Sequence, residues 1–196
     1  MEHSSRSNES SSRWLKDAER STGQPPVWTA LFPPGKGGGK GVGYGRKGKG
    51  VTIHCLVEKK GLPLSALVTP ANADERQQVF PLLEKVKART GKRGRPKKRP
   101  KTLAADKGYD SRKLRQALRR RGIRPEIPRR KWKGRKQPPG RKLVKRVARF
   151  VVERTFAWLQ RKFRRLVVRW ERLEVCFDAF VHVAIIMIWL QQLLVG

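Results

Sequence analysis

The segment Thr102–Ser111 joins a short apolar run to an aspartate, a glycine turn and the start of a helix. Thr102–Ala105 suits a buried strand, Gly108 supplies the turn, and Asp110 and Ser111 offer a helix N-cap. Because α/β proteins place reactive groups at the carboxyl ends of central strands, Asp106 is a candidate site residue. The alternative is that Asp106 only ends its strand and bonds its own turn.

Similar patterns along the chain predict the remaining elements. Further strands are expected at Trp28–Phe32, Val51–Glu58, Leu64–Thr69 and Ile123–Ile127. Helices are expected at Asp74–Lys87, Ser111–Arg121, Leu143–Val168 and Phe177–Leu194. Pro81 either kinks the first helix or marks its first turn. Three antiparallel strands followed by strand–helix–strand units predict an α/β fold, a mixed sheet flanked by helices. This is the element order of the ribonuclease H-like fold.

The charge of the chain points to a polyanionic partner. Lys and Arg number 48 against 15 Asp and Glu, a net charge of +33 that opposes compaction by self-repulsion. Basic residues recur along almost the whole chain, so nucleic acid is the first partner to expect. A membrane surface is the alternative, but the basic residues are not confined to one amphipathic helix. The apolar stretch Ala179–Leu190 is short for a membrane span, so we expect a packed core helix.

The N-terminal residues differ in character from the rest. Residues 1–26 are Ser-rich, polar and without apolar periodicity, so we expect a disordered leader without a signal peptide. Residues 27–196 then form a single domain. Cys55 and Cys176 lie far apart in apolar stretches without zinc-site spacing, and both are expected to be buried in a reducing compartment. His54, in the middle of a strand, is expected to pack rather than to bind a metal.

Pro33–Gly50 is crowded with glycine and lysine. The spacing of a phosphate-binding P-loop is absent. A basic loop beside a nucleic-acid backbone and a plain surface loop both fit the segment. In the first case, Arg46, Lys47 and Lys49 contact the backbone.

Glu153 is the only acid in the expected helix Leu143–Val168. It is either an ion-pair partner of Arg149 and Arg154 or a member of a site. Carboxylates in a strongly basic protein suggest phosphoryl transfer by two magnesium ions, which prefer oxygen ligands. In the ribonuclease H-like fold, acids on the first strand, after the fourth strand and on a later helix converge at one sheet edge. Asp106 and Glu153 occupy the second and third of these places.

From about Phe32 onward, the chain resembles the catalytic part of bacterial insertion-sequence transposases of the DDE class, in the insertion-sequence-four/five branch. The similar blocks cover residues 43–64, 68–76, 105–111, 149–161 and 164–172. The resemblance implies that Asp106 and Glu153 are the second and third catalytic, metal-binding carboxylates. It also implies Mg²⁺ or Mn²⁺ as the cofactor, in a two-metal site.

The resemblance further implies DNA as the partner, a homo-oligomer on DNA, and a cytoplasmic, nucleoid-associated location without a membrane. Arg149 belongs to the helix signature of the branch. Two departures affect residues that would position DNA, because Arg146 stands where a tyrosine is frequent and Gln160 where a lysine is common. We expect DNA contacts from Lys107, Arg149, Arg154 and Arg161 as well as from the glycine–lysine segment.

The first aspartate of the family is missing. Where Asp-Gly-Ser is usual, this chain reads Val27–Leu31, V-W-T-A-L. Trp followed by Thr is encoded by TGG-ACN, whose overlapping frame contains GAC, an aspartate codon. We hypothesise that residues up to about Leu31 come from another frame, so that the chain is a fragment or the second frame of a frameshifted element. Asp17 and Glu58 are the other acids that could complete the site.

The sequence therefore predicts a DNA transposase, incomplete in its catalytic domain, that binds DNA but cleaves it poorly. Its reaction would be metal-dependent phosphodiester cleavage and strand transfer. The alternative is a non-catalytic, basic nucleic-acid-binding protein. That alternative accounts for the charge but not for the acids at Asp106 and Glu153.

Overall fold

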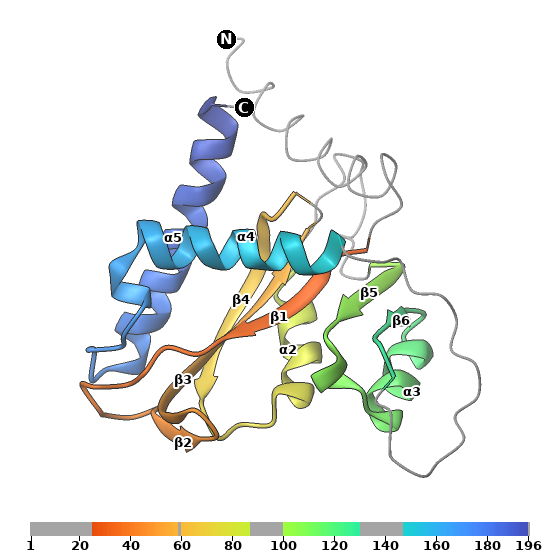
Figure 1. Cartoon of the computed structure of the whole chain (residues 1–196), viewed down its shortest axis with the longest axis horizontal. Coiled ribbons are helices and arrows are strands. Elements are labelled where there is room, and N and C mark those ends of the chain that lie inside the picture. The colour runs from red at the N-terminus through yellow and green to blue at the C-terminus, as the bar shows by residue number, and fades with distance from the viewer. Residues whose placement is uncertain (1–24, 59, 87–99, 130–146, 196) are drawn as a thin grey trace.

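The computed structural model describes residues 25–58, 60–86, 100–129 and 147–195 (Figure 1). Its strands are β1 (Val27–Leu31), β2 (Gly43–Gly45), β3 (Gly48–Val57), β4 (Pro63–Pro70), β5 (Thr102–Ala105) and β6 (Arg124–Glu126). Its α-helices are α2 (Val79–Glu84), α3 (Arg112–Arg120), α4 (Val147–Lys162) and α5 (Glu174–Val195). Short 3₁₀ turns lie at Glu75–Gln78 (η1), Lys107–Tyr109 (η2) and Arg164–Leu166 (η3).

The strands form one mixed sheet in the order β4-β3-β1-β5-β6, with β2 paired to the first residues of β3. β1, β3 and β4 pair antiparallel, while β5 runs parallel to β1 and β6 runs parallel to β5. Three antiparallel strands are thus followed by two parallel ones reached through helices. This arrangement confirms the predicted α/β, ribonuclease H-like fold.

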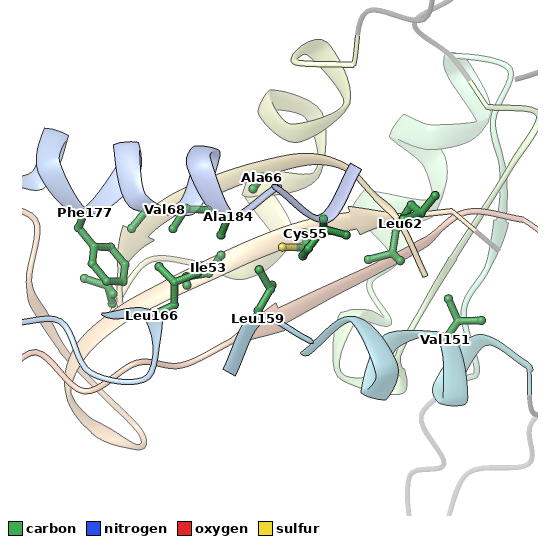
Figure 2. Packing of buried hydrophobic residues seen from close by; sticks show 14 residues of the cluster. Ile53, Cys55, Leu62, Ala66, Val68, Val151, Leu159, Leu166, Phe177 and Ala184 are labelled. Carbon is green, nitrogen blue, oxygen red and sulfur yellow. The ribbon is translucent and has the colours of Figure 1, made fainter. Parts of the chain in front are cut away.

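Helices cover both faces of the sheet, and β3 is buried on both sides. Val51 to Val57 of β3 are all buried, and successive side chains point to opposite faces. One face packs under α4 and α5, as Figure 2 shows for Ile53 and Cys55 beside Leu159 and Ala184. The other face packs under α2 and α3 through Trp28, Leu56, Leu82, Leu103 and Leu118.

The helix α5 packs by one side only. Phe177, Val181, Ala184 and Ile188 are buried in the core, whereas Phe180, Val183, Ile186 and Met187 are exposed. Among the described residues, Glu174–Leu194 is the one segment long and apolar enough to cross a membrane by length and composition. Core helices of soluble proteins can meet the same criteria. The buried line on α5 confirms the expected contact with the core.

Two expectations are wrong. Cys176 is exposed rather than buried, because it lies on the outward side of α5 beside the buried Phe177. The long helix ends at Lys162 rather than at Val168. Phe163 leaves helical geometry (φ −122°, ψ 80°), which lets the chain turn so that Arg169 becomes buried. Pro81 lies in the first turn of α2, one of the two predicted alternatives.

Some predictions fall outside the described residues. They concern residues 1–24 of the leader, including Asp17, and the start of the long helix before Val147.

Candidate active site

Asp106 lies directly after β5, where the sequence predicts it. Its backbone is still extended (φ −67°, ψ 161°), and the 3₁₀ turn η2 begins at the next residue. Ala104 and Ala105 before it are buried, whereas Asp106 itself is exposed. A buried strand that delivers an exposed carboxylate to its carboxyl end is the arrangement typical of α/β active sites.

The parallel pairing of β1 with β5 fixes what stands beside Asp106. Val27 is level with Ala104, and Trp28 is level with Ala105. One step further along both strands, Thr29 follows Trp28 and Asp106 follows Ala105. Neighbouring strands lie about 4.8 Å apart. Thr29 is therefore the residue of the central strand nearest in register to the candidate carboxylate.

Tyr109 fixes the turn that follows Asp106. Its ring is buried against Trp28, with ring centroids 4.0 Å apart. Burial raises the pKa of Tyr109, and a hydrogen bond to Glu75 and the negative charges of Glu75 and Asp106 raise it further. The hydroxyl therefore stays protonated at neutral pH and donates to Glu75. Neither Glu75 nor Tyr109 was singled out in the sequence, because their contact joins distant segments.

Glu153 lies on α4, and its side chain is exposed. The buried side of α4 carries Val151, Thr155 and Leu159. Glu153 is turned about 160° around the helix axis from Thr155. The Thr155 hydroxyl donates to the carbonyl oxygen of Gly61 at 2.6 Å, which attaches α4 to the turn between β3 and β4.

The acids in the described part of the chain do not make a complete metal site. Within residues 25–58, 60–86, 100–129 and 147–195, no group of three or more His, Cys, Asp or Glu side chains could hold a metal ion together. Two ions that clamp the attacking and leaving oxygens need several oxygen donors between them. Asp106 and Glu153 alone do not fit the predicted two-metal site.

Glu58, a possible replacement for the missing acid, has another role in the structure. It is buried, and its Oε1 accepts a hydrogen bond of 3.0 Å from the backbone N–H of Lys60. The same turn is closed by a backbone hydrogen bond from Glu58 to Leu62. Glu58 thus shapes the turn between β3 and β4.

Two of the predicted DNA-contacting residues on α4 have different surroundings. Arg154 donates to the carbonyl oxygen of Lys60 at 2.6 Å and lies 5.5 Å from the ring centre of Trp158. Arg154 therefore helps to attach α4 to the sheet. Arg161 is exposed near the end of α4. Lys107 is likewise exposed, next to Asp106, while the side chain of Arg149 lies outside the described residues.

The hairpin of β2 and β3 presents a basic tip. Arg46 and Lys47 form the two-residue connection, and Tyr44 pairs with Lys49 across the strands. All four side chains are exposed, Tyr44 to 78%. An exposed aromatic ring among cations can stack on a base while the cations hold phosphates. The sequence predicted the three cations of this hairpin, but not the exposed ring of Tyr44.

The glycine-rich segment before the hairpin packs against the chain near Arg169. A Cβ atom on Gly37 would lie 1.8 Å from the carbonyl oxygen of Trp170, and one on Gly39 would lie 2.2 Å from that of Arg172. The fully buried Arg169 donates to the carbonyl oxygens of Lys40, Glu171 and Arg172. These glycines therefore allow two backbones to approach closely, a role that the sequence pattern did not indicate.

His54 is a packing residue, as expected. It is buried, and its Nε2 lies 2.8 Å from the Thr69 hydroxyl oxygen. Burial lowers the pKa of His54 to about 4. The ring is therefore neutral at physiological pH, which suits a core position.

Comparison with known proteins gives one consistent result. Residues 19–189 match the family model described as a transposase DDE domain. A 127-residue stretch is 42% identical to a protein assigned as the transposase of insertion sequence element IS402 in Burkholderia cepacia. A 120-residue stretch is 36% identical to the transposase for insertion sequence element IS1106 of Neisseria meningitidis serogroup B.

The matched stretches cover 65% and 59% of this chain, but only 56% and 37% of those relatives. The chain thus spans about half the length of the first relative, or less for the second. The family match, in contrast, extends over most of the chain and includes β1, Asp106 and Glu153. The chain belongs to the insertion-sequence transposases with a DDE domain.

Proposed function

We propose that this chain is the DNA-binding part of an insertion-sequence transposase whose acidic site is incomplete. The observation that carries the proposal is Asp106, exposed at the end of a buried strand in a ribonuclease H-like sheet. Asp106 and Glu153 serve as two of the carboxylates of the site. Because no three His, Cys, Asp or Glu side chains of the described residues lie together as a metal site, we expect DNA binding without efficient cleavage.

The net charge of +33 supports DNA as the partner. Lys and Arg hold the phosphate backbone without reading sequence, and their binding releases counterions. The exposed cations Arg46, Lys47 and Lys49 form one contact region on the hairpin of β2 and β3. The protein acts in the cytoplasm on nucleoid DNA, as an oligomer that holds the DNA ends.

In the complete family site, Mg²⁺ or Mn²⁺ would supply charge stabilisation for phosphodiester cleavage and strand transfer. The residues described in this chain do not provide enough ligands for such a metal ion. The role of the chain's own residues is therefore limited to binding, in which the basic side chains hold the DNA backbone.

The salt dependence of DNA binding tests this proposal. Fluorescence anisotropy with a labelled duplex should give a log–log salt slope that falls by about 0.9 for each lost phosphate contact. A variant with Arg46, Lys47 and Lys49 changed to alanine should lower the slope by up to about 3.

A matched control carries the same change of charge on α3. Arg112, Arg119 and Arg120 are exposed on that helix, which covers the other face of the sheet from α4. Replacement of these three arginines by alanine should change the salt slope of DNA binding much less than the hairpin variant does. Equal losses in the two variants would contradict a local contact at the hairpin, and absence of DNA binding by the unchanged chain would overturn the proposal.

A non-catalytic, basic nucleic-acid-binding protein is the second candidate. The incomplete acidic site favours it, since such a protein needs no metal. The two candidates differ at Asp106. If the acid belongs to an incomplete catalytic site, restoring the missing carboxylate should produce metal binding that depends on Asp106.

A further inference from the structure

The outward side of α5 carries a second apolar line besides the line that packs on the core. Its members are all exposed, and we call them the outer seam: Cys176, Phe180, Val183, Met187, Leu190 and Leu194. The buried line, which includes Phe177 and Val181, lies roughly 100° around the helix axis from the outer seam. An apolar surface therefore still faces solvent after α5 has packed on the sheet.

The spacing of the outer seam indicates another helix as its occupant. Its members follow one another at intervals of four, three, four, three and four residues. Leu173, exposed just before α5, extends the line by a further interval of three. An average interval of 3.5 residues over about three heptads is the pattern that keeps one line of a helix against a partner helix.

The charge of the chain favours a second copy of α5 as that helix. Lys and Arg account for 48 of the 196 residues, yet none lies in the 22 residues of α5. Two copies with a net charge of +33 each repel one another, and α5 lets them meet without opposing cations of its own. A helix that lies on a lipid surface instead carries Lys and Arg on its polar side. Insertion into a membrane would also detach Phe177 and Val181 from the core.

An antiparallel pair of outer seams matches larger side chains with smaller ones. The register that pairs every member sets these residues opposite each other in the two copies: Phe180 and Leu190, Met187 and Val183, Leu194 and Cys176. Two-fold symmetry repeats each pair. Each layer then joins a larger to a smaller side chain, which fills the space between the helices evenly. A parallel pair would instead set Phe180 against Phe180 and Cys176 against Cys176.

Arg165 also favours the antiparallel arrangement. Its guanidinium lies 5.7 Å from the ring centre of Phe180, beside the outer seam. A parallel pair would bring the two Arg165 side chains to the same level. In the antiparallel register they lie at the levels of Phe180 and Leu190, about 15 Å apart along the axis. This separation exceeds the screening length of about 10 Å at 0.1 M salt.

We propose that the outer seam is a self-association surface, on which two copies of this chain pair through antiparallel α5 helices without DNA. The pairing gives a surface to the oligomer of the proposed function, but the residues that carry it are independent of the acidic site. Ile186 and Leu193 lie at the edge of the outer seam, outside its layers.

Sedimentation equilibrium of the nuclease-treated full chain tests the pairing. The unchanged chain should be a dimer, and Val183→Lys or Met187→Lys should raise its dissociation constant by at least about tenfold, since each buries a cation in the apolar layers. Val175→Lys is the matched control: Val175 is an exposed apolar residue of α5 outside the heptad positions, and its replacement should leave the constant nearly unchanged. A monomeric unchanged chain, or equal effects of M187K and V175K, would overturn the proposal.

The salt dependence separates this pairing from association through residual nucleic acid. Added salt should tighten the dimer, because it screens the repulsion between two chains of net charge +33. Association bridged by nucleic acid weakens as salt rises. A dimer that dissociates with added salt would therefore contradict pairing through the outer seam.

Disulfide cross-linking tests the antiparallel register. Cys55 is fully buried, so oxidation reports Cys176. In the register above, the two Cys176 residues lie about 27 Å apart along the axis, too far for a disulfide. Leu194→Cys, at an 82% exposed position, should cross-link with Cys176 of the second copy, whereas L194C/C176S should not. Cross-linking of the unchanged chain through Cys176 would overturn the antiparallel arrangement.

Two further measurements distinguish the other outcomes. Flotation with neutral phosphatidylcholine vesicles should leave the unchanged chain in the lipid-free fraction. Flotation of a monomeric chain that M187K abolishes would assign the outer seam to lipid and overturn the proposal. Duplex binding by a monomer would contradict only the pairing, whereas a dimer that binds no duplex would contradict only the proposed function.

Discussion

The buried guanidinium of Arg169 donates a hydrogen bond of 2.7 Å to the carbonyl oxygen of Lys40, 129 residues earlier in the chain. It also donates to the carbonyl oxygens of Glu171 and Arg172, and it lies 5.7 Å from the ring centre of Phe177. One side chain thus joins the glycine-rich segment, the turn after α4 and the start of α5.

Arg169→Met should destabilise the protein by about 3 kcal/mol, because it removes the donor from three partly buried hydrogen bonds to carbonyl oxygens. Arg169→Lys should recover little, since an ammonium group lacks the planar fork that reaches several oxygens. Urea denaturation followed by circular dichroism measures both. The exposed Arg172→Met is the control, with an expected loss below about 0.5 kcal/mol. Similar losses at both positions would contradict the role of Arg169.

Gly37→Ala should disrupt the same junction. Its Cβ would lie 1.8 Å from the carbonyl oxygen of Trp170, so one of the two backbones must move. Gly38→Ala is the matched control: its position is open and only its φ of 67° opposes a side chain, at a cost of about 1 kcal/mol. The melting temperature of Gly37→Ala should be well below that of Gly38→Ala. The reverse order would show that the glycine-rich segment does not pack against the backbone of Trp170.

Because of His54, the free energy of unfolding should fall as the pH falls. Its folded-state pKa of about 4 lies below the usual 6.5, so between these values the unfolded chain binds a proton that the folded chain excludes. The contribution of His54 is complete above about pH 6.5 and is lost as pH falls toward 4, by up to about 3 kcal/mol. Unfolding free energies measured from pH 7 to 4.5 should fall less steeply in His54→Gln. An unchanged slope in His54→Gln would contradict the effect.

The two sides of α5 should respond differently to truncation. Phe177 is fully buried in the core, whereas Ile186 is 56% exposed. Phe177→Ala should cost about 3–5 kcal/mol through lost burial and a cavity. Ile186→Ala should cost much less, because its side chain loses few contacts. Comparable costs in denaturant titrations would show that the outward side of α5 is also covered in solution.

Local patterns predicted much of this fold. The apolar runs at β1, β3, β4 and β5 each contribute buried residues to the core, so the positions of these strands follow from the pattern of apolar residues. The position of Asp106 at the end of β5 was predicted for the same reason. The end of α4 was not, because it depends on the burial of Arg169, a contact between distant segments.

The site itself was only partly predictable. Asp106 and Glu153 were candidates from the sequence pattern, and the resemblance implied their roles. The position of Thr29 beside Asp106 needs the strand register, which no single strand sequence contains. The role of Arg154 was also hidden, since its hydrogen bond to Lys60 depends on how α4 sits on the sheet. The close packing of Gly37 and Gly39 was not predicted either, because it depends on the backbone of a distant segment near Arg169.

The most direct measurement of the central claim is magnesium-dependent nicking of a supercoiled plasmid that carries the gene and its flanking DNA. The unchanged chain, at concentrations that saturate the plasmid by gel shift, should leave the supercoiled form at the level of the protein-free control. This result is expected because Asp106 lies beside Thr29 rather than beside a second carboxylate. Robust nicking that requires magnesium and disappears in D106N would contradict the account.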